Sequence, residues 1–335
     1  MKQLLKLSVA SFLIAGALAV QASTLSDVQS KGYVSCGVSK GLAGFSAADS
    51  SGTWTGVDVD VCRAVAAATL GDATKVQFVP LTAKERFTAL QSGEIDMLSR
   101  NTTWTITRDA SLGLNFAGVN YYDGQGFMVK SSLGVSSALE LGGAAVCIQA
   151  GTTTELNLAD WGKSNGIDYQ SVVSDTNAQT LTNYDSGRCD VLTTDASGLY
   201  SMRAASNDPS EHVVLPEIIS KEPLGPVVRQ GDDQWFNIVR WSLNAMITAE
   251  ELGVTSATVD EVTNNPERER LMGRSGNTHE YVGLTPDWTY NIISQVGNYS
   301  ESFERNIGLN TPIGIARGVN ALWTDGGILY SPPFR

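Results

Sequence analysis

The feature that most constrains the fold of this chain is a repeated alternation of short apolar runs and longer helical segments. In the first unit, apolar runs at residues 33–38, 76–80 and 95–99 alternate with helical segments at 57–70 and 82–93. Thr82 and Glu85 have the spacing of a capping box, and Gly93 lies where that helix should end. The order strand, helix, strand, helix, strand predicts a parallel, doubly wound sheet.

The same order starts again in the second half of the chain. Apolar runs at residues 145–149, 169–173 and 189–194 alternate with helical segments at 152–163 and 177–186. An extended segment at 116–130 connects the two units, and its Gly124 and Gly126 favour a hinge over an ordinary surface turn. A second crossing is predicted at 221–229, where two prolines stiffen the chain. Helices are then expected at 232–252, 286–303 and 319–323, with their tryptophans in core or docking positions.

The first 22 residues have the layout of a secretory signal peptide. Lys2 and Lys6 precede an apolar run at 7–20, and Val20-Gln21-Ala22 fits the small-x-small cleavage pattern. The run is too short to span a bilayer comfortably, and no later segment approaches the length of a membrane helix. We therefore expect export and cleavage after about Ala22, in preference to a buried N-terminal helix.

The charge of the chain excludes one class of partner. Its 335 residues carry a formal charge of -12, whereas nucleic-acid binding needs a basic surface. We therefore expect no nucleic-acid partner and no adhesion to anionic lipid. The length that remains after cleavage suggests two domains.

The cysteines are predicted to form disulfides instead of a metal site. None of the four lies in a C-x-x-C motif and the chain has only two histidines, so we expect no metal and no cofactor. Of three possible pairings, the organisation of the units favours Cys36–Cys62 in the first and Cys147–Cys189 in the second. Each bridge would close a loop within one unit and leave relative motion of the units free. The alternative of four free thiols is disfavoured in an exported chain.

Four segments are predicted to meet at one crevice, because ligands of open α/β sheets bind beyond the carboxyl ends of the strands. They are residues 39–45, 100–108, 151–154 and Asp195. The fork of Arg108 suits a carboxylate, and the helix start at 151–154 offers free N–H groups to an anion. Taken singly, Arg108 is better explained by a surface salt bridge with Asp109 or Glu85. Asp195 taken singly is equally well explained by an N-cap. Together they place anion donors opposite a carboxylate, which suits a zwitterion such as an amino acid.

Catalytic motifs are weak in this sequence. It contains no nucleophile elbow, no phosphate-binding P-loop and no Rossmann glycine fingerprint after a strand. Asp58 and Asp60 form a D-x-D pair that could bind metal, but acidic residues at a helix start explain it better.

Four segments together carry a family resemblance: GVDVDVC at 56–62, GEIDMLSRNTTWTITR at 93–108, QAGTTTE at 149–155 and GRCDVLTTD at 187–195. The chain resembles the extracytoplasmic amino-acid-binding proteins of ABC importers, solute-binding family three. It looks most similar to the larger members described as general L-amino-acid-binding proteins. The resemblance implies an α/β, two-lobed clamp in which each lobe is a doubly wound sheet and two hinge crossings join them. Lobe 1 would comprise residues 23–122 and 226–335, with extra C-terminal helices, and lobe 2 residues 123–225.

The resemblance also implies roles for single residues. Arg108 matches the arginine that holds the ligand α-carboxylate, assisted by Thr103 and Thr153, with Asn101 on the same loop. Asp195 matches the carboxylate that receives the α-ammonium group.

Other positions depart from the family pattern. Leu42 and Ala83 stand where many members place an aromatic residue, so Trp104 or Tyr122 is expected to cover the ligand instead. Ser39 stands where binders of basic ligands often have an acid. Arg100 replaces a small hydroxyl residue, and we expect it either to meet acidic side chains or to bridge the lobes. These departures suggest broad specificity.

The function that the resemblance implies is a monomeric periplasmic receptor. It would close on a free L-amino acid and deliver it to an inner-membrane ABC permease with its ATPase subunit. The alternative is an enzyme on the same clamp, such as a dehydratase of a cyclic amino-acid precursor. That enzyme would need a general acid, for which Glu85 and Glu155 are candidates, although helix capping explains both better.

Overall fold

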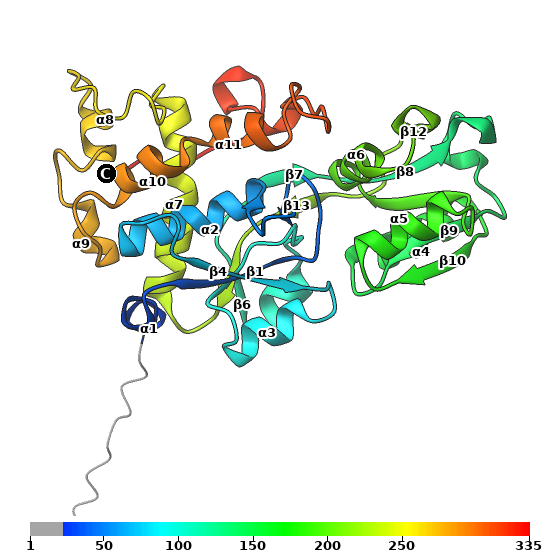
Figure 1. Ribbon diagram of the computed structural model, residues 1–335, viewed down its shortest axis with the longest axis horizontal. Helices are drawn as coiled ribbons and strands as arrows, with labels where there is room; N and C mark the ends of the chain where they lie inside the picture. The colour runs from blue at the N-terminus through cyan, green and yellow to red at the C-terminus, as the bar shows by residue number, and fades with distance from the viewer. Residues whose placement is uncertain (1–22) are drawn as a thin grey trace, which may run out of the picture.

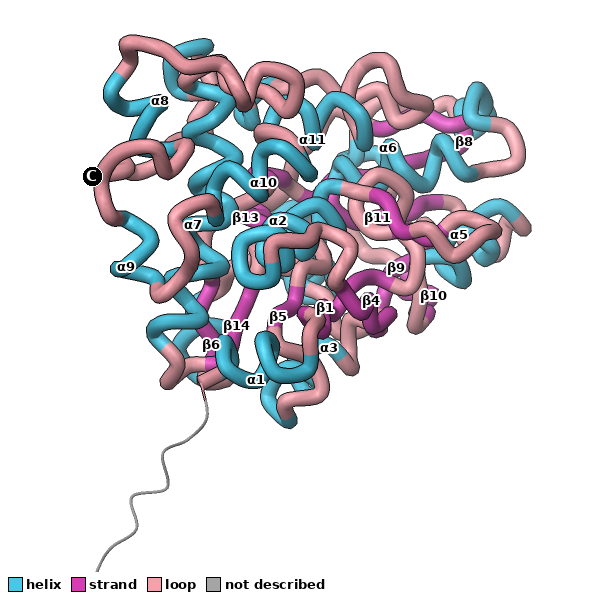
Figure 2. Tube along the Cα trace, turned by 60° about the vertical axis from the view of Figure 1, so that its left-hand side comes forward, coloured by secondary structure: helices cyan, strands magenta, loops and turns pink. Residues whose placement is uncertain are grey.

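The computed structural model describes residues 23–335 and contains two five-stranded sheets that form two lobes (Figure 1). The predicted signal peptide lies outside the described residues. In the first sheet the strand order is β4-β1-β5-β14-β6, which Figure 2 shows in sequence. Its strands are β1 (Val34–Ser39), β4 (Val76–Leu81), β5 (Met97–Leu98), β6 (Leu114–Phe116) and β14 (Val227–Arg229). Strand β1 pairs in parallel with β4 and β5, as predicted, whereas β14 pairs antiparallel with β5 and β6.

The helices of the first lobe follow the predicted alternation. They are α1 (Thr24–Lys31), α2 (Val57–Leu70) and α3 (Arg86–Ser92). The capping box before α3 is present, since the Thr82 amide donates to Glu85 and the Glu85 amide donates to the Thr82 hydroxyl. Gly93 ends this helix in the left-handed conformation, as expected. A small hairpin of β2 (Ala47–Ala48) and β3 (Trp54–Thr55) precedes α2.

The second lobe has strand order β10-β9-β11-β8-β12. Its strands are β8 (Gln125–Lys130), β9 (Ala145–Gln149), β10 (Gln170–Ser174), β11 (Val191–Asp195) and β12 (His212–Val214). Its helices are α4 (Thr153–Asn165), α5 (Asn177–Asp185) and α6 (Ala196–Ala205). The three predicted strands are again parallel neighbours, and β8 and β12 extend the sheet antiparallel to β11 and β8.

Both crossings between the lobes run side by side. Strand β7 (Tyr121–Asp123) pairs antiparallel with β13 (Glu222–Leu224). The chains approach so closely that a Cβ on Gly225 would lie 1.9 Å from the carbonyl oxygen of Gly118. Glycine at this position is therefore required by packing.

The C-terminal extension packs against helix α2 of the first lobe, mainly through α7 and α10 (Figure 2). Its helices are α7 (Asp233–Glu251), α8 (Pro266–Leu271), α9 (Thr278–Val282), α10 (Trp288–Val296) and α11 (Tyr299–Asn306). The single helix expected at 286–303 is wrong. Gly297 has φ 90°, and Asn298 begins α11 with a capping box, so the chain turns between α10 and α11. The short helix expected at 319–323 is replaced by the 3-10 turns Gly318–Asn320 and Trp323–Asp325.

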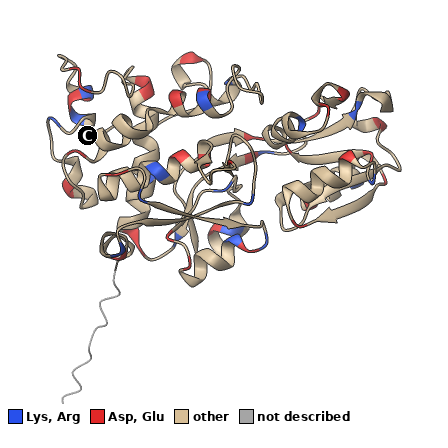
Figure 3. Ribbon diagram, in the orientation of Figure 1, with Lys and Arg blue, Asp and Glu red and all other residues tan. Residues whose placement is uncertain are grey.

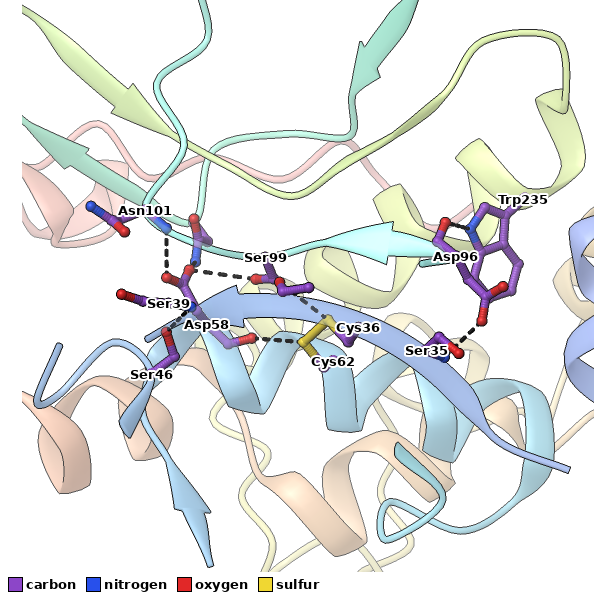
Figure 4. The surroundings of a disulfide bond; sticks show 12 residues. Ser35, Cys36, Ser39, Ser46, Asp58, Cys62, Asp96, Ser99, Asn101 and Trp235 are labelled. Carbon is purple, nitrogen blue, oxygen red and sulfur yellow. Dashed lines mark hydrogen bonds between the residues drawn. A yellow bond between two sulfur atoms is a disulfide. The ribbon is translucent and has the colours of Figure 1, made fainter. Parts of the chain in front are cut away.

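Both predicted disulfides are present. Cys36 of β1 is bonded to Cys62 of α2, as Figure 4 shows, and Cys147 of β9 is bonded to Cys189, two residues before β11. Each bond lies within one lobe. None of the helices in residues 23–335 is long and apolar enough to cross a membrane. Acidic residues are spread over both lobes and the extension (Figure 3).

Candidate functional site

The loop that follows β5, residues 100–103, lies where the two lobes meet. Asn101 has φ 28°, a left-handed conformation that is unusual for a residue other than glycine. Its amide donates to Asp58 Oδ2 at 2.7 Å, and its side-chain amide donates to Asp195 Oδ2 of the second lobe at 3.3 Å. Backbone strain of this kind concentrates at ligand sites, where the surrounding structure must hold it in place.

Asp58 is the residue that holds this loop. Its buried carboxylate also accepts a hydrogen bond from Asn120 at 2.9 Å. A further hydrogen bond comes from Ser99 at 3.4 Å, as Figure 4 shows. Burial raises the pKa of Asp58, and the hydrogen bonds oppose that shift. Asp60, the other acid of the D-x-D pair, accepts from Ser302, Arg305 and Asn306 and so fixes α2 to α11. Among residues 23–335, no group of three or more side chains is placed to hold a metal ion.

Glu222 of the hinge strand β13 gathers donors from both lobes, and sequence reasoning did not find it. Its Oε2 accepts from the hydroxyls of Thr103 at 2.6 Å and Thr153 at 2.8 Å. Its Oε1 accepts from Asn157 at 2.6 Å and Ser220 at 2.7 Å. The two predicted threonines are therefore brought together, with their hydroxyl oxygens 3.3 Å apart. The available signal for this residue was that it is the single acidic residue of the crossing at 221–229.

Arg108 lies in a π-helical turn, Thr107–Ser111, of a kind that often occurs at functional sites. Its Nη1 donates to the Thr103 carbonyl at 2.9 Å, and its guanidinium lies over the ring of Phe87, 5.2 Å from the centroid. Burial lowers the pKa of Arg108, whereas the charges of Glu222 and Asp195 raise it. The surface salt bridge considered for Arg108 is not formed; the side chain is 8% exposed.

Two further arginines are buried beside it. Arg100 donates through Nε to the Leu81 carbonyl at 3.0 Å, and Arg86 donates through Nη1 to the Thr102 hydroxyl at 3.3 Å. Both are 2% exposed. Burial lowers the pKa of Arg100 to about 10, and Asp58 and Asp195 oppose this shift. Arg86 was missed in the sequence, although a cation in the first turn of a helix is unfavourable and could have marked it.

Asp195 ends β11 and precedes α6. Its side chain makes no capping bond to that helix, so the N-cap explanation does not hold. Burial raises the pKa of Asp195, and the neighbouring charges of Asp123 and Glu222 raise it further. Asp123 accepts from the hydroxyl and amide of Ser197, and burial raises its pKa to about 6.

The opposite charges of this site are separated. Across residues 23–335, no ion pair within 4.0 Å joins Arg86, Arg100 or Arg108 to a carboxylate. Burial lowers the pKa of all three arginines and the charge of Asp195 opposes this shift in each, so the four side chains share one region. Arginines on one lobe and a carboxylate on the other suit a dipolar solute between them.

The remaining predicted residues are placed as follows. Ser39 is buried at the end of β1, where its amide donates to the Ser46 hydroxyl at 2.9 Å, and Leu42 is buried beside it. Trp104 stacks on Phe116 and, with Tyr122, lines a hollow bounded by α7. Phe87 is the aromatic ring that lies beside Arg86 and Arg108.

The two candidate general acids have structural roles. Glu85 accepts from the Thr82 amide and pairs with Lys40 at 3.1 Å, and these contacts lower its pKa to about 2. Glu155 accepts from the Gly151 amide at 2.7 Å at the start of α4.

The lobes touch along the cleft, which makes this a closed conformation. Lys84 forms an ion pair with Asp175 across the cleft at 2.7 Å. Ser201 donates to the Ala43 carbonyl at 2.8 Å, and Asn177 donates to the Gly41 carbonyl at 3.5 Å.

Comparison with known proteins then identifies the family. The model for bacterial extracellular solute-binding proteins, family 3, matches residues 34–258. This chain belongs to that family. General L-amino acid-binding periplasmic protein AapJ of Rhizobium johnstonii is 61% identical over 330 residues, covering 97% of each chain. Glutamate/glutamine/aspartate/asparagine-binding protein BztA of Rhodobacter capsulatus is 56% identical over 326 residues, covering 96% of each.

A solved structure agrees with the fold of this family 3 protein. The periplasmic binding protein of an ABC transporter from Brucella ovis, with glutathione bound, superposes with a TM-score of 0.92 at 56% identity. The match covers 94% of this chain and 100% of that one. Because the family model ends at residue 258 while these alignments continue, the C-terminal extension is shared with these relatives. The predicted family and two-lobed fold are confirmed.

Proposed function

We propose that this chain is a periplasmic receptor that captures free L-amino acids between its lobes and delivers them to the permease of an ABC importer. The observation that carries the proposal is the placement of Arg108 and Asp195 on opposite lobes of one buried region, without a salt bridge between them. The names of the full-length relatives support amino-acid binding and transport by an ABC system.

Each charged group has a separate role in this proposal. Arg108 binds the α-carboxylate, with Thr103, Thr153 and the loop at Asn101 contributing further donors. Asp195 accepts hydrogen bonds from the α-ammonium group. A ligand held by both lobes interacts more strongly with the closed state than with the open one, and this difference in free energy drives closure.

The partners follow from the same argument. The closed surface is presented by a monomer to an inner-membrane permease, whose ATPase subunit drives release. Export with cleavage after about Ala22 places the mature chain in the periplasm. A catalytic role has no support from Glu85 or Glu155, since both carboxylates serve helix starts, and the relatives are named as binding proteins.

A thermal-shift screen of the common L-amino acids tests the proposal. A ligand that binds only the folded state at a hundred times its Kd stabilises the fold by about 2.7 kcal/mol, which is a clear upward shift in Tm. We expect such shifts with several amino acids, and the recovered ligand should be chemically unchanged by mass spectrometry. No shift with any of them, or a converted product, would contradict the receptor assignment.

A further inference from the structure

Arg86 and Arg100 provide more hydrogen-bond donors beside Arg108 than binding of an α-amino acid requires. Arg108 alone can bind an α-carboxylate through its fork. Arg86 and Arg100 are both 2% exposed, and each makes a single hydrogen bond to residues 23–335, through Thr102 and the Leu81 carbonyl respectively. A guanidinium has five N–H donors, so most donors of both groups are unused. The Arg86 Nε is buried and has no partner in the described chain.

No acid of residues 23–335 forms a direct ion pair with these two arginines, and nearby carboxylates act on them only at longer range. Glu222 already accepts four hydrogen bonds from neutral groups, and Asp123 accepts from Ser197 and Gly124. Asp58 accepts from Asn101, Asn120 and Ser99. Asp195 is the carboxylate left with one hydrogen bond, from Asn101, and the ligand ammonium occupies it. Buried guanidinium N–H groups without acceptors are costly, so a ligand carboxylate that accepts from Arg86 and Arg100 would be bound favourably.

The three guanidinium groups lie together. Arg86 and Arg108 both lie over the ring of Phe87, at 4.8 and 5.2 Å from its centroid. Arg86 contacts Thr102, Arg108 contacts the Thr103 carbonyl, and Arg100 begins the same loop. An anion bound by Arg86 and Arg100 would therefore belong to the same ligand as the carboxylate on Arg108.

We infer that Arg86 and Arg100 form a second anion subsite, which selects L-amino acids that carry a second carboxylate. This inference rests on the proposed function, because it assigns the far end of the same ligand. The second carboxylate can belong to a short side chain, as in glutamate or aspartate, or to the end of a γ-glutamyl peptide such as glutathione. The receptor would then bind several amino acids but bind acidic ligands more tightly than neutral ones.

Calorimetric titration of the periplasmic protein with L-glutamate, L-aspartate, L-glutamine, L-alanine and glutathione tests this inference. A hydrogen bond to a charged group contributes enough to binding that an acidic ligand should bind at least about tenfold tighter than glutamine. Tighter binding of glutathione than of glutamate or aspartate would identify the peptide as the source of the second carboxylate. Equal affinities for acidic ligands and glutamine would overturn the subsite and leave the receptor proposal intact. Absence of binding for every amino acid would overturn the proposed function itself.

Variants separate a ligand contact from a structural role. Arg86→Gln and Arg100→Gln should each remove most of the preference for the acidic ligand while changing glutamine affinity by less than about threefold. Arg100→Lys keeps the charge and should retain part of the preference. Arg240→Gln, a matched loss of charge on α7, should change neither affinity. An equal loss for acidic and neutral ligands in both glutamine variants would show that the arginines only support the fold. The comparison of ligands on the wild-type protein stands even where a variant fails to fold.

Discussion

At the scale of single residues, the cleft is dominated by three buried arginines and by Asp195, whose carboxylate accepts one hydrogen bond. The proposed roles of a first group of residues follow from the family resemblance of segments that can be recognised in the sequence: Arg108, Thr103, Asn101, Thr153 and Asp195. Arg86 and Glu222 could not be found in this way, because their importance comes from contacts with residues distant in sequence. Glu222, for example, joins Thr103 and Thr153, which belong to different lobes.

Arg108→Ala should abolish amino-acid binding, with a loss of at least about a hundredfold, because it removes a charge-assisted bidentate contact. Calorimetry measures the loss, and circular dichroism should show an unchanged fold. Arg188→Ala, an exposed arginine of the second lobe, is the matched control. Near-normal affinity in the Arg108 variant would reject its role.

The raised pKa of Asp195 predicts that amino-acid affinity rises with pH above about 4. The ligand ammonium group binds the ionised form of Asp195. Because burial favours the protonated form of Asp195, ligand binding must release that proton. The folded protein also binds protons more tightly than the unfolded chain, because burial raises the pKa of Asp123 to about 6. The unliganded protein should therefore become less stable as pH rises from about 4 through about 6.

Titrations between pH 5 and 8 in buffers of different ionisation enthalpy check this proton release. Asp195→Asn should flatten the pH dependence and weaken ligands with a free α-ammonium more than their deaminated analogues. Asp160→Asn, on the exposed side of α4, should retain the wild-type slope. An equal loss for deaminated analogues would count against the assigned role of Asp195.

At the scale of secondary structure, the regular alternation of apolar runs and helical segments was sufficient to predict the central strands and helices of each lobe. The helix predicted at 57–70 is α2 with the same bounds, and the β-α-β-α-β order placed both disulfides correctly. The division between α10 and α11 was missed because apolar residues continue across Gly297, and the turn depends on the Asn298 cap. Strands β8, β12 and β14 join sheets through long-range pairing that local patterns do not encode.

Asn320 of the C-terminal extension makes two hydrogen bonds to the hinge strand β7. Asn320 accepts from the Tyr122 amide at 2.7 Å and donates to the Tyr122 carbonyl at 3.0 Å. Asn320→Ala should lower the free energy of unfolding by about 1–3 kcal/mol, because it leaves the amide and the carbonyl of Tyr122 without these hydrogen-bond partners. Urea unfolding measures the change, with the exposed Asn310→Ala as control. Equal stability of the two variants would show that the attachment contributes nothing.

At the scale of the whole molecule, closure depends on contacts across the cleft that differ in strength. The Lys84–Asp175 ion pair lies at the rim and both side chains are exposed, so its contribution is small. Lys84→Ala should weaken ligand binding by less than about fivefold at low salt, and the effect should vanish at 1 M salt. Titrations at the two salt concentrations test this. A larger loss that persists in high salt would mean that Lys84 contacts the ligand or is needed for closure.

The central claim is that one zwitterionic ligand is held by both lobes at once. A crystal structure with the amino acid that gives the largest thermal shift tests it most directly. We expect the α-carboxylate within hydrogen-bonding distance of the Arg108 guanidinium and the α-ammonium within that distance of the Asp195 carboxylate. A ligand bound to one lobe only, or bound away from these two side chains, would contradict it.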